Sequence, residues 1–275
     1  MLGQAVAAAA TRLHHEVLAP SGAELDVTDP AAVREDLAAF APAAIINCAA
    51  WTDVDGAESH EAEALAVNGE GAGTVARAAA AFGARIVHVS TDYVFDGAAR
   101  EPYAEDHPVA PVGAYGRTKL SGEQAVAAAA EDHAIVRTAW LFGAGGRNFV
   151  DTILGLAAER DELEVVADQV GSPTWTGHLA PALVEVAERR DTGILHAAGA
   201  GRCSWYELAV EAIDRAGLLC RVVPTTAARF PRPAPRPAFS VLGRTRKESP
   251  VLPPWQEGLA GHLAAKVPTG AGGKA

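Results

Sequence analysis

The chain has 275 residues, enough for one to two domains, and its 49% hydrophobic and 21% charged residues are typical of a globular protein. Its 23 basic and 34 acidic residues give a net charge of −11, with no basic cluster to follow a phosphate backbone, which argues against nucleic acid as a partner. No apolar run approaches the ~20 residues of a membrane span and the first residues lack a basic signal-peptide region, so we expect a cytoplasmic protein without a membrane partner.

Short apolar segments alternate with helical segments through the first half of the chain. The helical segments are 29–40, 62–83 and 116–130, and Asp29 followed by Pro30 is an N-cap with proline at the first helical position. The predicted strands are 15–19, 43–50, 84–90 and 133–140. This alternation predicts an α/β fold, a Rossmann-type doubly wound parallel sheet with helices on both faces.

The pattern loosens after residue 149. Helices are predicted at 150–160, 176–190 and 204–216, and short strands at 162–166 and 193–198. We therefore expect a dinucleotide-binding domain at 1–149, a smaller and mainly substrate-binding part at 150–265 with some segments returning to the sheet, and a flexible tail at 266–275.

A proline-rich stretch at 225–239 is expected to be an ordered loop, because each proline removes a main-chain donor from any strand ladder. It carries three arginines that could face either a diphosphate or solvent, namely Arg229, Arg232 and Arg236.

The cysteines and histidines carry no metal signature. Cys48, Cys203 and Cys220 are far apart and form no C-x-x-C pair, and the nine histidines show no H-E-x-x-H spacing. We expect a reduced protein without a structural metal.

Three residues form a pattern suited to carbonyl reduction. Tyr115 and Lys119 are four apart at a helix start, so they share one face, and the ammonium is expected to lower the phenol pKa towards working pH. Thr91 ends a predicted strand, where open α/β sheets bind ligands. A lone Y-x-x-x-K is a weak signal, but the added hydroxyl at a strand end makes the combination specific.

Five segments resemble those of the extended short-chain dehydrogenase/reductases, specifically the dTDP-4-dehydrorhamnose reductase group. They read STDYVFDG, YGRTKLSGEQ, RTAWLFG, DQVGSPTWT and RPAFSVL, and the resemblance runs from residue 1 to about residue 263. It implies NADPH- or NADH-dependent reduction of the 4-keto group of a dTDP-4-dehydro-6-deoxysugar, with dTDP-4-dehydrorhamnose to dTDP-L-rhamnose as the first choice. It also implies a nucleotide-sugar partner and leaves a homodimer open.

The resemblance also implies roles for individual residues. Tyr115 would protonate the C4 oxygen, Lys119 would hold the nicotinamide ribose, and Thr91 would hydrogen-bond the substrate carbonyl. Further substrate contacts would come from Asp92, Trp140 and Val54. Besides Tyr115 and Lys119, the cofactor contacts would be Gly3, Asp26, Val27, Ala49, Ala50, Trp51, Thr52 and Val89.

Some of these assignments have a structural alternative. Asp26 could only start a turn before Thr28, and Trp140 could fill the core at a strand end. In this fold an acidic residue at the end of the second strand usually binds the adenosine ribose. The corresponding region here, at the end of the strand predicted at 15–19, reads Ala19, Pro20, Ser21 and Gly22 without a carboxylate, which favours NADPH or the use of both cofactors.

The chain opens as MLGQAVAAAA, where Gly3 resembles the last glycine of a phosphate-binding turn. A dinucleotide fold of this class is expected to begin with a strand of about five residues and a G-x-x-G-x-x-G turn. We therefore expect that roughly ten residues are absent through a misplaced start codon or trimming, and that the chain as printed binds dinucleotide poorly.

Two other functions stay open at this stage. A non-catalytic nucleotide-binding subunit, resembling the regulatory β subunit of methionine adenosyltransferase, is favoured by the shortened opening and opposed by the intact Thr91, Tyr115 and Lys119. A nucleotide-sugar 4-epimerase or dehydratase is the other alternative, and dehydration is disfavoured because Asp92 has no adjacent glutamate.

Overall fold

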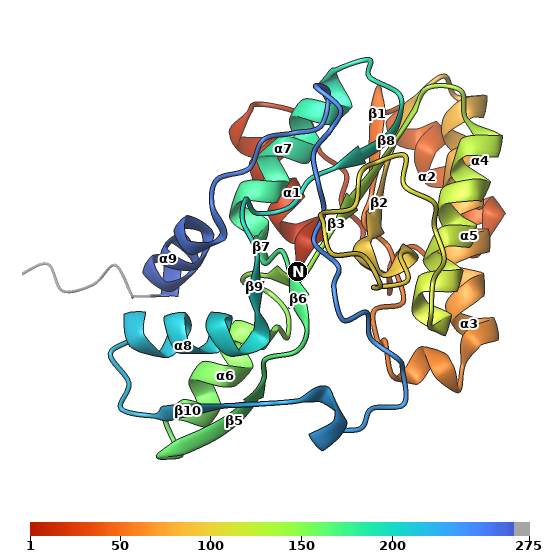
Figure 1. Cartoon of the computed structure of the whole chain (residues 1–275). Coiled ribbons are helices and arrows are strands. Elements are labelled where there is room, and N and C mark those ends of the chain that lie inside the picture. Colours follow the sequence, from red (N-terminus) through yellow and green to blue (C-terminus); the bar gives the residue numbers. More distant parts are fainter. Residues whose placement is uncertain (267–275) are drawn as a thin grey trace, which may run out of the picture.

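The computed structural model describes residues 1–266, and its centre is a four-stranded parallel sheet between two layers of helices (Figure 1). In register, Ile46, Val87, Ala134 and Gly193 lie side by side across the sheet. The strands, in spatial order, are β1 (Ala44–Asn47), β2 (Arg85–Thr91), β3 (His133–Thr138) and β8 (Gly193–His196). The predicted α/β fold class is confirmed.

Alternation along β2 decides which helices cover which face. Val87 packs with α1 (Leu2–Arg12) and α7 (Thr176–Glu188), while Ile86 packs with α2 (Pro30–Phe40) and α4 (Ala72–Ala81). Helix α5 (Ala114–Ala129) lies beside α4 on that second face (Figure 1). Both faces of the sheet are therefore buried, as parallel strands require.

The start of α2 follows its sequence signal. The Asp29 side chain accepts hydrogen bonds from the N–H groups of Ala31 and Ala32, and Pro30 occupies the first helical position. The predicted N-cap is confirmed.

The predicted helix at 62–83 is a continuous helical segment with a wider π turn in the middle. It consists of α3 (Glu61–Leu65), the π segment Ala66–Gly71 and α4. A Cβ at Gly122 of α5 would lie 2.1 Å from the Asn68 carbonyl oxygen, so only glycine permits this approach. The crossing brings α5 close to the π segment and fixes its position over β2.

The strand predicted at 15–19 is wrong. Residues 15–20 adopt no regular secondary structure, and β1 pairs with β2 alone among the described strands. An extended segment becomes a strand only when a neighbour completes its ladder, and residues 15–20 have no such neighbour.

The second half of the chain forms a smaller body and also completes the main sheet. The body contains α6 (Phe149–Ala157), α8 (Trp205–Arg215), α9 (Trp255–Lys266) and the parallel pair β5 (Glu162–Val166) and β10 (Arg221–Thr225). Helix α7 and strand β8 return to the main sheet. Two short pairs lie between, β4 (Leu141–Phe142) with β7 (Thr174–Trp175), and β6 (Val170–Gly171) with β9 (Cys203–Ser204).

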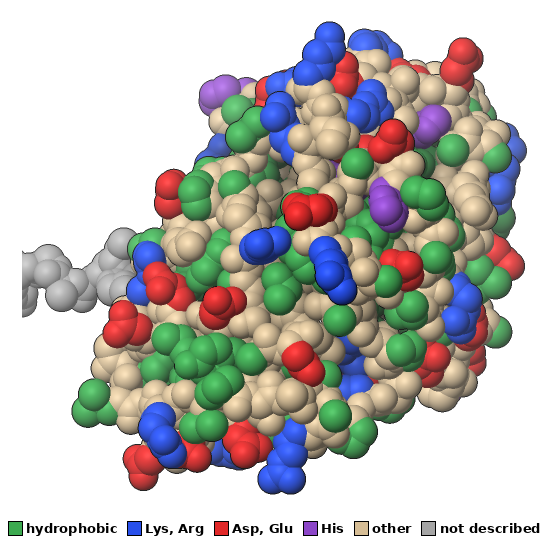
Figure 2. Space-filling model, viewed as in Figure 1, with side chains coloured by type: hydrophobic (Ala, Val, Ile, Leu, Met, Phe, Trp, Pro, Cys, Tyr) green, Lys and Arg blue, Asp and Glu red, His purple; other side chains and the backbone are tan. Residues whose placement is uncertain are grey.

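Three 3₁₀ turns, Gly56–Glu58, Asp92–Val94 and Ala227–Arg229, complete the elements. The last of them lies in the proline-rich stretch, which is otherwise irregular between the end of β10 at Thr225 and a single bridge from Phe239 to Val170, as predicted. Of the predicted tail at 266–275, only Lys266 is described, as the last residue of α9. No helix in residues 1–266 is long and apolar enough to cross a membrane. Figure 2 shows acidic and basic side chains intermixed over one face of the molecule.

Candidate active site

The structure brings Thr91, Tyr115 and Lys119 together at the carboxyl end of β2. Thr91 is the last residue of that strand, and α5 begins one residue before Tyr115. A Cβ at Gly116 would lie 2.2 Å from the Tyr93 carbonyl oxygen, so glycine lets the first turn of α5 approach the chain that follows β2. The Tyr93 and Tyr115 rings meet edge to face with centroids 5.6 Å apart.

The environment of Tyr115 keeps its phenol protonated. Burial, followed by the charge of Asp92, raises the pKa of Tyr115 to about 12, and a hydrogen bond with Thr91 opposes the rise. The expectation that Lys119 lowers this pKa is wrong for the protein alone, because the lysine head group hydrogen-bonds elsewhere. A protonated phenol is the form that a general acid needs.

Lys119 is anchored beneath the end of β2. Its Nζ donates to the Val89 carbonyl oxygen at 2.8 Å and lies 3.3 Å from His88 Nε2. Burial lowers the pKa of Lys119 to about 8, with Glu123 and Cys48 opposing the fall. The lysine therefore carries a labile proton inside the protein.

The contact of Lys119 with His88 on β2 extends to Asn47 at the end of β1. The sequence analysis predicted neither His88 nor Asn47. Asn47 Nδ2 lies 3.3 Å from His88 Nδ1, and Asn47 Oδ1 accepts from the Ala49 N–H at 3.1 Å. Burial, followed by the charge of Lys119, lowers the pKa of His88. A signal existed, because Asn47 ends the apolar segment Ala44–Ile46 and His88 lies between Val87 and Val89 in a buried strand.

Asn68, also missed, holds the turn that follows β1. Its Oδ1 accepts from the Trp51 N–H at 2.9 Å, and its Nδ2 donates to the Trp51 carbonyl at 3.2 Å and to Thr118 Oγ1 at 3.1 Å. The side chain is fully buried. The Asn68 amide thus ties the predicted cofactor residue Trp51 to Thr118 of α5, one residue before Lys119. In the same turn, the predicted cofactor residue Thr52 is exposed and the predicted substrate residue Val54 is half-buried.

Asp92 is a buried carboxyl beside Thr91. Its Oδ1 accepts from Thr91 Oγ1 at 3.1 Å, and its Oδ2 has no hydrogen-bond partner within the described part of the chain. Burial raises the pKa of Asp92 to about 6, while hydrogen bonds from Ser240 and Thr91 oppose the rise. A buried carboxyl oxygen without a partner is rare in folded proteins and is consistent with the raised pKa of this group.

Trp140 is held in an unfavourable backbone conformation two residues after β3. Its φ is +47°, in the left-handed region that favours glycine, and its ring stacks on Trp205 with centroids 3.4 Å apart. A Cβ at Gly171 would lie 2.3 Å from the Trp140 ring, so the indole fits between Gly171 and Trp205. The ring is therefore held in one position, packed against the core cluster that includes Phe142 and Val150.

The proline-rich segment reaches this site through Arg236. Both terminal nitrogens of Arg236 pair with the Asp55 carboxylate, at 2.9 and 3.0 Å, and Arg232 lies 3.4 Å from the same group. Arg229 instead lies 3.5 Å from Glu164. Arg236 is therefore held by an ion pair with Asp55 and is not a free solvated side chain.

A large cavity brings together five of the predicted cofactor residues. Its volume is about 1210 Å³, and it runs along β1 between α1 and α2. The lining includes Gly3, Asp26, Val27, Ala49 and Ala50.

These residues fit one end of a dinucleotide. Helix α1 has no side-chain N-cap hydrogen bond, so its first amides are free for an anion, and Gly3 in that turn is exposed. Asp26 Oδ1 accepts from Thr28 N–H and Oγ1, at 2.9 and 2.8 Å, so this residue does shape a turn while lining the cavity.

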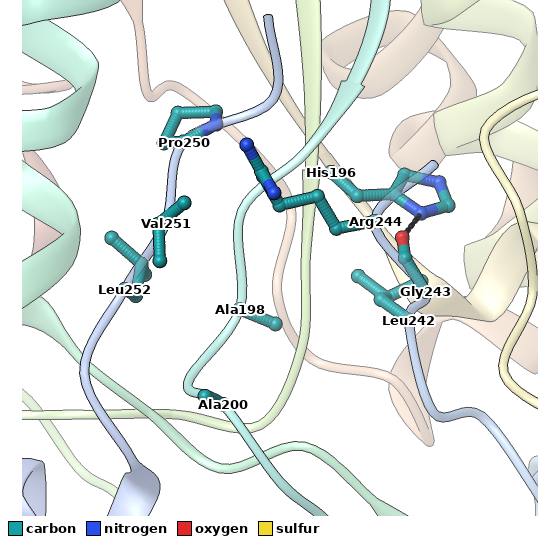
Figure 3. Close-up of a pocket in the computed structure, with 9 residues that line it drawn as sticks. All are labelled: His196, Ala198, Ala200, Leu242, Gly243, Arg244, Pro250, Val251 and Leu252. Atoms are coloured by element: carbon teal, nitrogen blue, oxygen red, sulfur yellow. Dashed lines mark hydrogen bonds between the residues drawn. The ribbon is translucent and has the colours of Figure 1, made fainter. Parts of the chain in front are cut away.

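A second cavity, of about 90 Å³, lies between the end of β8 and the segment 242–252 (Figure 3). His196 Nδ1 donates to the Gly243 carbonyl oxygen at 2.7 Å, which ties the two walls together. The space is that of about three water molecules, too small for a sugar nucleotide. Within residues 1–266 no group of three or more histidine, cysteine or acidic side chains could hold a metal ion.

Comparisons with known proteins agree with this arrangement. The family described as the RmlD substrate binding domain matches residues 1–267. The chain belongs to this family, the dTDP-4-dehydrorhamnose reductases, as predicted.

Three relatives illustrate the similarity. The dTDP-4-dehydrorhamnose reductase of Streptomyces griseus is 45% identical over 96% of this chain and 90% of its own length. A probable dTDP-4,6-dihydroxy-2-methyloxan-3-one 4-ketoreductase of Streptomyces antibioticus is 47% identical over 94% of this chain and 90% of its own length. The crystal structure of dTDP-4-dehydrorhamnose reductase from Bacillus anthracis in complex with NADP has a TM-score of 0.93 at 35% identity, covering 96% of this chain and 95% of that one.

Proposed function

We propose that this protein is an oxidoreductase that reduces the 4-keto group of a dTDP-4-dehydro-6-deoxysugar with NADPH or NADH. The observation that carries the proposal is the cluster of Thr91, Tyr115 and Lys119 at the end of β2, on a chain whose relatives are named for this reaction. Because a bound NADP is named for one relative, NADPH is our first choice of cofactor. dTDP-4-dehydrorhamnose is our first choice of substrate.

Each polar group at the end of β2 has a role in this reaction. The Thr91 hydroxyl would donate to the substrate carbonyl oxygen, where negative charge develops. The Tyr115 phenol, kept protonated by its surroundings, would deliver the proton to that oxygen. Asp92 and Trp140 would bind the sugar, with Val54 beside them, and a bound nicotinamide would supply the hydride.

The cofactor would lie against the carboxyl end of β1. Its phosphates would meet the first turn of α1 at Gly3, its adenine would lie near Asp26 and Val27, and its nicotinamide half would pass Ala49, Ala50, Trp51, Thr52 and Val89 towards Lys119. Assembly as a homodimer, a location in the cytoplasm and the division at residues 149 and 150 remain predictions.

The test is loss of the reduced nicotinamide absorbance with dTDP-4-dehydrorhamnose, for the protein and for Tyr115→Phe. We expect turnover that falls roughly 100-fold or more in the variant, because the ring remains and only the proton donor is lost. Tyr103→Phe is the control, since that hydroxyl donates to Asp96 Oδ1 at 2.7 Å and its ring stacks on Phe95.

Two results would count against the proposal. Equal rates for the protein and Tyr115→Phe would exclude the assigned acid. Firm cofactor binding without reduction of any keto-sugar would favour the regulatory-subunit alternative.

A further inference from the structure

Helix α5, which carries Tyr115 and Lys119, begins without a cap from its own sequence. Its N-cap residue is Gly113, which has no side chain, and its first turn holds no acidic residue. The first amides of a helix have no acceptor within the helix, and a buried amide left unpaired is costly. Ala114, the first residue of α5, is fully buried, so its N–H needs an acceptor from another part of the chain.

Glu58 supplies that acceptor from the 3₁₀ turn Gly56–Glu58. Its Oε1 accepts from the Ala114 N–H at 2.7 Å. A Cβ at Gly113 would lie 2.8 Å from the same oxygen, so glycine at the N-cap position lets the carboxylate reach the helix. A carboxylate is stabilising at the positive end of a helix, and a hydrogen bond to a charged acceptor is stronger than one to a neutral acceptor.

The contact lies one residue from the proposed acid. Ala57, Ala64 and Ala114 form a small buried cluster, and the rings of Trp51 and Tyr115 pack against it. Helix α3, which follows the turn, lies beside α5 (Figure 1). Because the buried residues of this cluster are all alanines, the turn that carries Glu58 packs closely against the start of α5.

The turn that carries Glu58 is itself held by several hydrogen bonds. Gly56 N–H donates to Asp53 Oδ1 at 2.9 Å, and Ala57 N–H donates to the Asp53 carbonyl oxygen at 3.0 Å. Asp55, one residue before the turn, forms the ion pair with Arg236. Glu58 therefore projects from a base that is tied both to its own segment and to the proline-rich stretch.

We propose that Glu58 is a positioning residue for the reduction, whose carboxylate holds the first turn of α5 so that the Tyr115 phenol meets the substrate carbonyl beside Thr91. The inference rests on the proposed function and adds to it a residue that acts through Tyr115. Glu58 neither gives nor takes a proton in this role.

The test compares the protein with Glu58→Ala in the reduction of dTDP-4-dehydrorhamnose by NADPH. We expect kcat to fall roughly tenfold or more, because moving a reacting group by about 1 Å can cost about 100-fold. KM for the sugar nucleotide and KM for NADPH should stay unchanged, since the substitution removes no contact to either molecule.

A second readout separates positioning from a general loss of structure. The solvent deuterium isotope effect on kcat should increase in Glu58→Ala, because proton delivery by a displaced Tyr115 becomes slower relative to the other steps. A smaller folded fraction would lower kcat without this increase. Hydrogen exchange at the Ala114 amide should also become faster, which checks the contact itself in the absence of substrate.

Two variants serve as references. Glu58→Gln keeps an acceptor oxygen at the same reach and should recover most of the lost kcat. Glu61→Ala is the matched control, because the Glu61 carboxylate also joins this segment to the start of α5, through Arg117 at 2.8 and 2.7 Å. That pair is exposed and should contribute little, so kcat and the isotope effect should equal those of the parent protein.

Three outcomes would overturn the inference while leaving the proposed function in place. Glu58→Ala could turn over as fast as an active parent protein, or it could lose kcat with an unchanged isotope effect. Glu61→Ala could lose as much kcat as Glu58→Ala, which would assign the effect to anchoring of the whole segment. A parent protein that reduces no keto-sugar would instead overturn the proposed function, and the inference with it.

Discussion

The buried ammonium of Lys119 is expected to destabilise the fold that contains it. The pKa of Lys119 falls from its ordinary value of 10.5 to about 8, and the side chain is only 2% exposed. A base whose pKa is lower in the folded chain than in the unfolded chain costs stability at every pH below both values. At about 1.4 kcal/mol per pKa unit, the cost at neutral pH is about 3 kcal/mol.

The sign of the pH dependence follows from proton counting. Between pH 8 and 10.5 the folded protein has released the Lys119 proton while the unfolded chain still holds it. The contribution of Lys119 to the free energy of unfolding therefore rises with pH across this window, by about 3 kcal/mol in all and by about two-thirds of that at pH 9.5. Burial raises the pKa of the Cys48 thiol from 9.0 to about 12 and also raises that of Cys203, so these thiols lower stability above about pH 9, and only the difference from Lys119→Met isolates the lysine. Lys119→Met has no group to titrate and should lack this rise.

Urea unfolding of the protein and of Lys119→Met, at intervals from about pH 7 to 9.5, measures the difference directly. The series stops there because the pKa of Tyr115 is also raised, to about 12, and would lower stability above pH 10. Lys247→Met is the matched control, since that side chain is 92% exposed and should track the parent protein. Parallel stability curves for the protein and Lys119→Met would refute the reasoning.

Two further substitutions test the neighbouring groups. Asp92→Asn should stabilise the protein by up to about 3 kcal/mol at neutral pH, because the pKa of Asp92 is raised from 3.8 to about 6, and the gain should vanish near pH 4. Urea unfolding at both pH values checks this, and a gain that persists in acid would contradict it. Gly171→Ala should push Trp140 aside and raise KM for the sugar nucleotide about tenfold or more, leaving KM for the cofactor unchanged. Steady-state kinetics with each substrate varied in turn measures the two KM values. Equal rises in KM for the sugar nucleotide and KM for the cofactor would indicate general damage to the fold and contradict the prediction.

Local sequence signals predicted most of the fold because they act over a few residues. The Asp29–Pro30 start of α2 specifies its element without help from distant parts, and the segment 162–166 forms the predicted strand because β10 completes its ladder. The strand predicted at 15–19 failed because pairing depends on a neighbour, and neither composition nor periodicity reports whether a neighbour is present.

The candidate site was predictable where its residues form a spaced motif. Tyr115 and Lys119 share a helix face, and Thr91 ends a strand, so simple periodicity places them near one another. The pKa of Tyr115 was not predictable, since it is raised by burial and by the charge of Asp92, and both depend on the tertiary structure.

Hydrogen-bond counting links the charge of Lys119 to the turn that follows β1. Asn47 Oδ1 accepts from Ala49 N–H, which leaves its Nδ2 to donate to His88 Nδ1. A neutral imidazole has one lone pair, so its proton then lies on Nε2 and faces Lys119 Nζ, which can accept it only as a neutral amine. The ammonium and the Asn47 amide therefore compete for one acceptor.

This competition predicts a change of tautomer at His88. At pH 7, where Lys119 is charged, the ammonium should take the Nε2 lone pair, and the proton should lie on Nδ1. Above the Lys119 pKa of about 8 it should move to Nε2. Ring nitrogen shifts of His88 between these pH values measure the change. Asn47→Leu removes the donor that competes for the Nδ1 lone pair, so the proton should stay on Nδ1 to higher pH in this variant. A tautomer that stays constant through the titration would show that the lysine and the turn at Ala49 are not coupled, and that the low pKa of Lys119 reflects burial alone.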